Sequence, residues 1–185
     1  MSAASLLKYC YLAYVAKPVA ERNIYRLIRR QRVRRIVELG IGDASRAQRM
    51  IAVSQRYQGD TEVSYAGIDL FEARDEDRPL LPLKRAYKLL TPAGARLQLV
   101  PGDAYTALAR AANSLLGTDL LIISADQDDA SLRRAWFYVP RMLHENSTVL
   151  VEHIGDGPDA ESRYQELPAD DIGQLAEVAA PRRAA

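Results

Sequence analysis

The sequence predicts an α/β protein with a doubly wound, mostly parallel sheet of about five strands, ordered 3-2-1-4-5, with helices on both faces. Short runs rich in Val, Ile and Leu alternate with longer amphipathic runs along most of the chain. Parallel strands need crossover connections, and these connections place helices over both faces of the sheet. The first apolar run also ends in a glycine turn, as the first strand of such a sheet commonly does.

The N-terminal half begins with two expected helices, over residues 3–16 and 18–30. Pro18 stands where the first turn of a helix tolerates proline. The stretch "RRIVELG" then predicts a strand over residues 34–40. The same reasoning predicts helices over residues 45–57 and 81–90, and strands over residues 62–70 and 95–103.

The C-terminal half continues the alternation. We expect helices over residues 104–117 and 129–144, and strands over residues 118–126 and 147–155. Pro140 must bend or restart the second of these helices, because proline removes one backbone hydrogen bond. Residues 155–185 carry seven acidic residues and several Gly and Pro breaks, so this tail is expected to hold at most one helix, near residues 171–179.

Length and composition fit one ordinary folded domain over residues 1–185, with 48% hydrophobic and 26% charged residues. We divide it into an N-terminal helical cap (1–32), a core (33–154) and an acidic tail (155–185). Residues 1–35 hold nine Lys and Arg but one acid. The arginines fall at helical spacing, so they are explained first as the solvated face of an amphipathic helix.

Cysteine usage and hydropathy bear on location. Cys10 is the single cysteine of the sequence, which excludes an intrachain disulfide and suits a reducing cytoplasm. The apolar stretch "SLLKYCYLAYVA" is interrupted by Lys8 and is shorter than the roughly 20 residues that span a membrane. We therefore expect a cytoplasmic protein without a membrane segment.

The glycine turn "ELGIGDAS" lies where open α/β sheets bind ligands, at the carboxyl end of the first strand. A dinucleotide fingerprint would need Gly or Ala where Ser45 stands, which weakens a prediction of NAD binding. A phosphate-binding P-loop is excluded because no Gly-Lys-Ser/Thr follows.

Read as acidic-x-Gly-x-Gly-x-small, the turn supplies Glu38, Gly40, Gly42 and Ala44, and residues 33–154 here resemble the class I S-adenosylmethionine (SAM) dependent methyltransferases. The resemblance implies a Rossmann-like fold and SAM as cofactor. It implies that the glycine loop passes close to the amino acid end of SAM, where side chains at Gly40 and Gly42 would fill the space that the ligand needs. Ala44 departs from the third glycine that is usual in the family.

The later strand ends extend the resemblance. It implies that Asp69 accepts hydrogen bonds from both ribose hydroxyls, with Leu70 and Phe71 packed on the adenine. In "LVPGDAY", Asp103 would bind the exocyclic amine of adenine, with Ala104 beside it. The segment "DLLIISADQDD", which contains Ser124, would face the transferred methyl group. Gly and Asp also favour tight turns for backbone reasons alone, so each match has a structural alternative.

Methyl transfer to a hydroxyl needs a base, for which His153 is our first candidate because histidine titrates near neutral pH. Asp126 and Glu152 also lie at the expected strand ends. A lone histidine at a strand end is more often a structural or surface residue, and Asp126 is equally explained by the loop before the next helix. The region resembles metal-dependent O-methyltransferases, yet Ser124 stands where their first aspartate would fall and Glu152-His153 replaces their Asp-Asn pair. We predict no metal site.

The favoured function is therefore SAM-dependent methylation of a small molecule, with the basic helices covering the pocket or holding an anionic substrate. Methyltransferases of this class add two more strands, one antiparallel, which residues 155–185 are not expected to supply. The alternative is a non-catalytic binding or assembly module whose open sheet edge pairs with a second copy in a homodimer. Nucleic acid methylation is less favoured, since it rests on the Arg-rich N-terminus alone.

Overall fold

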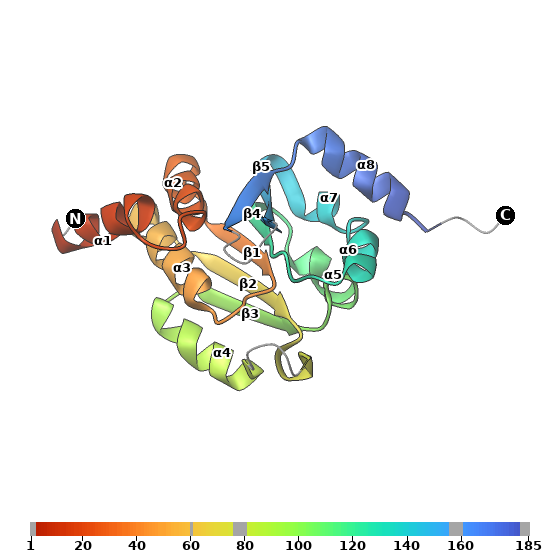
Figure 1. Cartoon of the computed structure of the whole chain (residues 1–185), viewed down its shortest axis with the longest axis horizontal. Helices are drawn as coiled ribbons and strands as arrows, with labels where there is room; N and C mark the ends of the chain where they lie inside the picture. The colour runs from red at the N-terminus through yellow and green to blue at the C-terminus, as the bar shows by residue number, and fades with distance from the viewer. Residues whose placement is uncertain (1–2, 60, 76–80, 156–160, 182–185) are drawn as a thin grey trace.

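The computed structural model describes residues 3–59, 61–75, 81–155 and 161–181 of the 185-residue chain (Figure 1). Its sheet has six strands in the order β3-β2-β1-β4-β5-β6. They are β1 (Arg35–Leu39), β2 (Ser64–Asp69), β3 (Arg96–Pro101), β4 (Thr118–Ile123), β5 (Leu143–Ile154) and β6 (Ser162–Glu166). Strands β1 to β5 are parallel to their neighbours, and β6 runs antiparallel to β5. The predicted order 3-2-1-4-5 is confirmed.

The prediction of a tail with a helix but no strand was wrong, because residues 162–166 form β6. Leu150 lies opposite Glu166 in this pairing, and Ile154 lies opposite Ser162. The segment "SRYQE" is an edge strand with mostly exposed side chains, so it carries no apolar run that would mark it in the sequence. β6 also covers the edge of β5 that was expected to stay open.

Helices cover both faces of the sheet, as predicted (Figure 1). The first group packs over one face in a buried cluster with Ile36, Tyr65 and Leu120, and the second group packs over the other face with Val37, Leu39 and Leu121. The first group comprises α1 (Ala3–Tyr14), α2 (Glu21–Gln31), α3 (Ser45–Gln58) and α4 (Leu83–Leu90). The second comprises α5 (Ala104–Ala111), α6 (Asp129–Ala135), α7 (Val139–Met142) and α8 (Ala169–Ala179). Single 3₁₀ turns, η1 (Phe71–Ala73), η2 (Thr91–Ala93) and η3 (Ala112–Ser114), complete the connections.

The helix expected over residues 129–144 is divided in two. α6 ends at Ala135, and Pro140 lies in the first turn of the short α7, where its missing N–H removes no intrahelical bond. β5 consequently begins at Leu143, four residues before the expected start at 147. The proline thus restarts the helix, which is one of the two outcomes that the sequence predicts.

The N-terminal helices pack on α3. The rings of Tyr9 in α1 and Tyr57 in α3 meet edge to face with centroids 5.3 Å apart, and the guanidinium of Arg29 lies over both rings. Arg22 donates to the carbonyl oxygens of Val15 and Ala16. Several basic side chains of this region therefore have intramolecular partners.

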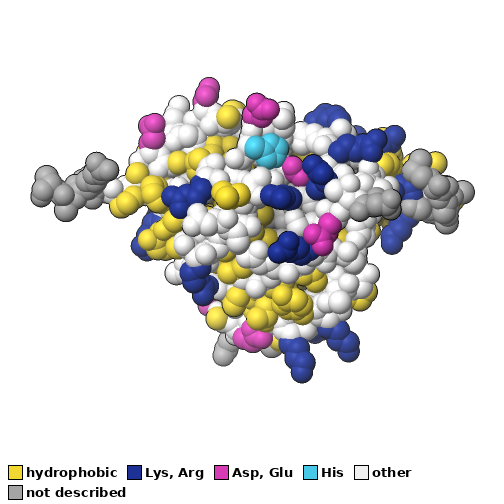
Figure 2. Space-filling view, turned by 180° about the vertical axis from the view of Figure 1, so that it is seen from behind, with side chains coloured by type: hydrophobic (Ala, Val, Ile, Leu, Met, Phe, Trp, Pro, Cys, Tyr) yellow, Lys and Arg dark blue, Asp and Glu magenta, His cyan; other side chains and the backbone are white. Residues whose placement is uncertain are grey.

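Lys and Arg side chains do not form one continuous basic patch on the face that Figure 2 displays. Lys and Arg side chains there are interspersed with acidic and hydrophobic ones (Figure 2). Across the described ranges, no helix combines the length and apolar character that crossing a membrane requires.

Candidate functional site

The glycine turn sits at the carboxyl end of β1, between the ends of β2 and β4. The N–H of Gly40 donates to the carbonyl oxygen of Ile68 in β2 at 2.8 Å, and the N–H of Ser124 donates to that of Leu39 at 2.9 Å. Gly40 and Gly42 have φ angles of +82° and +57°, in the region that favours glycine. The turn therefore lies at the reversal of strand order, where this kind of sheet binds ligands.

The two glycines have different surroundings. A Cβ on Gly40 would lie 2.6 Å from Nε2 of Gln127 and 2.7 Å from Oδ1 of Asp126, whereas a Cβ on Gly42 would meet nothing within 4 Å. The crowding that requires glycine at position 40 thus comes from the protein's own side chains. The space around the Cβ position of Gly42 is open.

Ala44 occupies the third small position of the motif. It adopts a left-handed conformation, with φ +67° and ψ 4°, immediately before α3. Its methyl group is fully buried in the cluster beneath α3. The departure from glycine is accommodated by the core, and a contact of Ala44 with a cofactor stays a prediction.

Asp69, the last residue of β2, points its carboxylate at the glycine turn. Oδ2 accepts from the N–H of Ile41 at 2.8 Å, and both carboxylate oxygens accept from the guanidinium of Arg74 at 2.6 and 2.7 Å. Burial would raise the pKa of Asp69, but the hydrogen bonds from Arg74 and Ile41 and the charge of Arg74 outweigh it and lower the pKa. Asp69 is therefore an ionised, two-oxygen acceptor at the rim.

The residues that follow Asp69 differ in accessibility. The ring of Phe71 is fully buried in the cluster of the first face, so it does not lie on the rim where an adenine would stack. Leu70 is half-buried beside it. Of the two predicted apolar contacts to adenine, Leu70 alone keeps an accessible surface.

Asp103 caps helix α5. Its carboxylate accepts from the backbone N–H groups of Tyr105 and Thr106 at 3.0 and 3.1 Å, from Oγ1 of Thr106 at 2.6 Å, and from the hydroxyl of Ser131. Burial would raise its pKa, but these hydrogen bonds lower it to about 2. Ala104 is buried in the second-face cluster. The role of both residues toward adenine stays a prediction.

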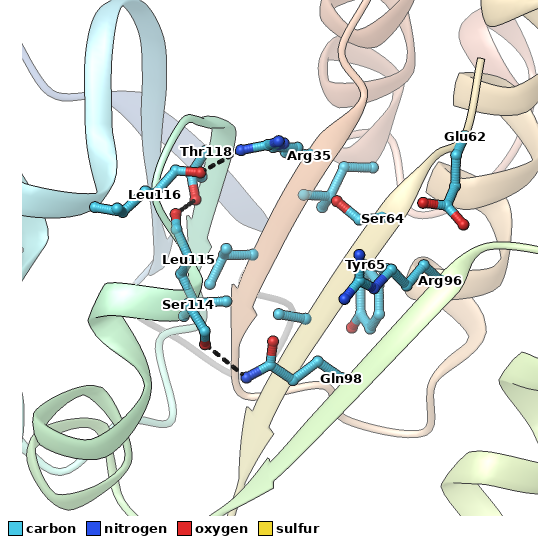
Figure 3. A pocket seen from close by; sticks show the side chains of 13 residues that line it. Arg35, Glu62, Ser64, Tyr65, Arg96, Gln98, Ser114, Leu115, Leu116 and Thr118 are labelled. Carbon is cyan, nitrogen blue, oxygen red and sulfur yellow. Dashed lines mark hydrogen bonds between the residues drawn. The ribbon is translucent and has the colours of Figure 1, made fainter.

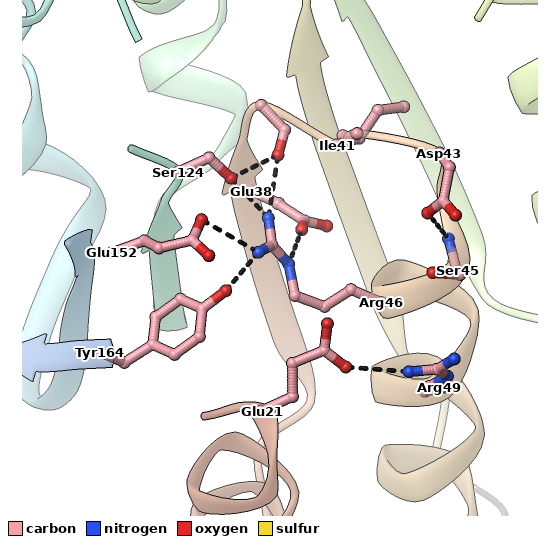
Figure 4. Close-up of polar contacts among 12 residues, drawn as sticks. Glu21, Glu38, Ile41, Asp43, Ser45, Arg46, Arg49, Ser124, Glu152 and Tyr164 are labelled. Atoms are coloured by element: carbon pink, nitrogen blue, oxygen red, sulfur yellow. Dashed lines mark hydrogen bonds and ion pairs between the residues drawn. The ribbon is translucent and has the colours of Figure 1, made fainter. Parts of the chain in front are cut away.

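A polar cluster at the rim centres on Arg46, in the first turn of α3 (Figure 4). Its guanidinium joins groups from β1, β5, β6, the glycine turn and the residue that follows β4. It donates to Glu38 Oε1 at 2.5 Å, Gly40 O at 3.0 Å, Ser124 Oγ at 2.5 Å and Glu152 Oε2 at 3.4 Å, and to the hydroxyl of Tyr164. We call these six residues the Arg46 cluster.

Burial and charge explain why this cluster forms. Glu38 is fully buried, which raises its pKa, while Arg46 and the hydroxyl of Tyr65 bind its carboxylate and oppose that rise. Burial would lower the pKa of Arg46, but Glu38 and the other acceptors outweigh it, so Arg46 remains a cation. A buried carboxylate needs such a partner, because an unpaired buried charge costs several kcal/mol, about 3–5 when one partner is removed.

The candidate bases lie in different places. Successive side chains of a strand point to opposite faces, so Glu152 shares the face of Leu150, and His153 shares that of Val149. His153 therefore faces away from the Arg46 cluster, which contains Glu152. Asp126 is exposed and lies beside Gly40.

Two surface cavities lie at opposite ends of the strands. One, of about 450 Å³, lies between residues 17–20 and the ends of β5 and β6, and Glu152 and Ile154 line it. The other, of about 250 Å³, lies at the amino ends of β1 to β4, beside residues 114–116 (Figure 3). The second cavity lies at the amino ends of the strands, whereas the glycine turn lies at their carboxyl ends. The first cavity adjoins the Arg46 cluster through Glu152.

The structure thus brings most predicted site residues to one rim. Glu38, Gly40, Ser124 and Asp69 surround the glycine turn, and Asp126 lies beside it. Arg46, Arg74 and Tyr164 were missed. An acid in the buried strand β1 needs a cation nearby, and this requirement could have indicated Arg46, but no local pattern marks the other two. The described residues include no group of three or more His, Cys, Asp or Glu arranged to hold a metal ion.

Comparison with known proteins places this fold. No protein-family profile matches the sequence, and no curated protein sequence matches it. Among solved structures, the O-methyltransferase of Bacillus cereus in complex with SAH aligns at a TM-score of 0.54 and 13% identity, over 82% of this chain and 67% of that one. TomG, an O-methyltransferase of Streptomyces achromogenes involved in tomaymycin synthesis and solved with SAM, aligns at 0.54 and 14% over 96% and 78%.

A Staphylococcus aureus protein described as a caffeoyl-CoA O-methyltransferase aligns at a TM-score of 0.53 and 16% identity, over 82% of this chain and 66% of that one. The chain therefore spans about two thirds of the length of the S. aureus and B. cereus proteins. At these identities the likeness concerns the fold, which is that of the class I SAM-dependent methyltransferases. The fold prediction is confirmed.

Proposed function

We propose that this chain is a SAM-dependent methyltransferase that acts on a small molecule. The observation that carries the proposal is the ionised carboxylate of Asp69, which is bound to the amide of Ile41 and directed at the glycine turn. A carboxylate with two accepting oxygens suits the two vicinal hydroxyls of a ribose. The open space above Gly42 supports a ligand at the same rim.

The residues of this rim suit the nucleoside end of SAM once the side chain of Arg74 is displaced. Asp69 would hold the ribose, Leu70 would contact the adenine, and Gly42 would leave room for the amino acid end. Bound SAM supplies an activated methyl group, so the protein has mainly to align the acceptor with it. The structural neighbours solved with SAH or SAM share this fold and support the choice of cofactor.

The acceptor is proposed to enter the cavity beside Glu152. Glu152 lines this cavity, its Oε2 accepts from Arg46 and from the N–H of Ala125, both at 3.4 Å, and its carboxylate interacts with the hydroxyl of Tyr164. Glu152 is therefore better placed than His153 to take a proton from an acceptor hydroxyl at this cavity. Asp126, near Gly40, is the second candidate. The cavity combines apolar Val19 and Ile154 with charged groups, which suits a small amphipathic acceptor.

The proposal also covers the cellular location and the oligomeric state of the protein. The single exposed cysteine is suited to a cytoplasmic location. A homodimer would use the outer edge of β3 or β6, because β6 already pairs with β5. The basic N-terminal helices would border the acceptor cavity through residues 17–20.

A titration with S-adenosylhomocysteine (SAH) in a calorimeter tests the proposal. We expect binding by the wild-type chain, loss of binding in Asp69→Ala, and no change in Glu177→Ala, which removes an exposed carboxylate on α8. At about 100 times the Kd, SAH should stabilise the wild-type fold by about 2.7 kcal/mol. Binding that survives in Asp69→Ala would remove the central support of the proposal.

The second candidate is a non-catalytic module of the same fold. The observation that favours it is that Arg46 and Arg74 already satisfy the acceptors of the rim, including Glu38, the carbonyl oxygen of Gly40, and Asp69. It leads to the opposite result, namely no SAH binding by the wild-type chain or by an Arg74→Ala variant. Titration of both chains therefore separates the two functions.

A further inference from the structure

Arg74 follows η1 and folds its side chain back over the end of β2. Nε donates to Oδ1 of Asp69 at 2.7 Å, and Nη2 donates to Oδ2 at 2.6 Å, so the guanidinium binds both carboxylate oxygens. Nη2 also donates to the carbonyl oxygen of Gly42 at 2.9 Å. The side chain is 5% exposed, so this is a buried pair and not a loose surface contact.

The guanidinium presents to Asp69 the same kind of donor pair that a ribose would present. Two parallel N–H groups meet the two oxygens of one carboxylate, as two vicinal O–H groups would. Since the remaining interactions of Asp69 are with the backbone amides of Ile41 and Phe71, Arg74 holds the positions toward which a ribose would be directed. Both donors cannot occupy them together.

We propose that Arg74 competes with the ribose of the cofactor for Asp69 and thereby sets the affinity of this site for nucleosides. This inference rests on the proposed SAM-binding function. It gives a role to Arg74, which lies outside the glycine motif. Cofactor binding then exchanges one two-donor partner of Asp69 for another. The measured affinity is lowered by the fraction of molecules in which Arg74 is bound.

Electrostatics supplies a second partner for the displaced side chain. Asp126, exposed beside Gly40, interacts with the charge of Arg74, next to the stronger interaction of Arg74 with Asp69. A guanidinium that leaves Asp69 therefore remains in a negative environment at the rim. This lowers the cost of the exchange compared with release into solvent alone.

Calorimetric titration of SAH into Arg74→Ala and wild-type protein tests this competition. If Arg74 occupies Asp69 in about nine molecules of ten, its removal should tighten SAH binding about tenfold. Arg74→Lys should lie between the two, because lysine keeps the charge but not the two-pronged donor geometry. Arg85→Ala, which removes an exposed arginine of α4, should bind like the wild type.

Titration with two nucleosides tests whether Arg74 competes with the ribose hydroxyls for Asp69. Arg74→Ala should gain more affinity for adenosine than for 2′-deoxyadenosine, which lacks one of the two donors. Because Arg74→Ala leaves a buried carboxylate with fewer partners, Arg74→Gln serves as a second variant that keeps neutral donors. Circular dichroism melting of each variant establishes that the folded chain is titrated.

The outcomes separate the two proposals. Tighter binding by Arg74→Ala or Arg74→Gln supports the competition. Unchanged or weaker binding by both variants, with SAH still bound by the wild type, overturns the competition and leaves the proposed cofactor intact. Absence of binding in the wild type and in every Arg74 variant overturns both.

Discussion

The carboxylate of Asp103 binds the first backbone amides of α5, so its removal should weaken that helix. We expect Asp103→Ala to lower the free energy of unfolding by about 1 kcal/mol, the usual cost of losing such a cap. Asp103→Asn should cost less, because its amide oxygen still accepts from the N–H groups of Tyr105 and Thr106. Urea unfolding followed by circular dichroism measures both differences.

The pH dependence of this cap has a definite sign. The pKa of Asp103 is lowered to about 2, so its contribution to stability is complete above the unfolded value near 4 and is lost as pH falls through the folded value. The difference between wild type and Asp103→Ala should therefore shrink on acidification below about pH 4. A difference that stays constant down to about pH 2 would contradict the assignment of Asp103 as an ionised cap.

Residues of the rim were predictable from sequence to different degrees. Gly40, Gly42 and Asp69 follow strand ends, and the carboxyl ends of parallel strands meet at one edge, so their proximity follows from the alternation of elements. Arg74 reaches Asp69 from a segment without regular periodicity. Its pairing depends on the path of that segment, which no local pattern records.

At the scale of elements, α1 offers a matched pair of tyrosines. Tyr9 is 3% exposed and packs against Tyr57 and Arg29, whereas Tyr11 on the same helix is 56% exposed. We expect Tyr9→Ala to lower the free energy of unfolding by about 3 kcal/mol, as for other buried aromatic residues. Tyr11→Ala should change it by less than about 0.5 kcal/mol. Chemical denaturation of both variants measures the packing of α1 on α3.

Equal effects of the two tyrosine substitutions would mean that α1 does not hold this position in solution.

The helices and strands of the core were predicted because their apolar residues recur at helical or strand spacing. β6 was missed for the opposite reason. Its exposed edge position imposes no apolar requirement on "SRYQE".

For the whole molecule, we propose that residues 1–185 unfold as one domain. The cap contributes Tyr9 and Ile24 to the same buried cluster as the core residues Ile36 and Met50, so the two parts share one interior. Thermal unfolding followed by far-ultraviolet circular dichroism and by the fluorescence of Trp136, which is 5% exposed on the other face, should give one common midpoint. Separate midpoints would show that the cap melts independently of the core.

Arg46 has a consequence for how related chains can diverge. One guanidinium binds a fully buried acid in β1 and also reaches β5, β6 and Ser124, which follows β4. An exchange at position 46 alone would therefore leave Glu38 without its cation. A tolerated loss of Arg46 should therefore be accompanied by a neutral residue at position 38 and by changed residues at positions 152 and 164. We therefore expect these positions to vary together among related sequences, because their side chains share the one positive charge of Arg46.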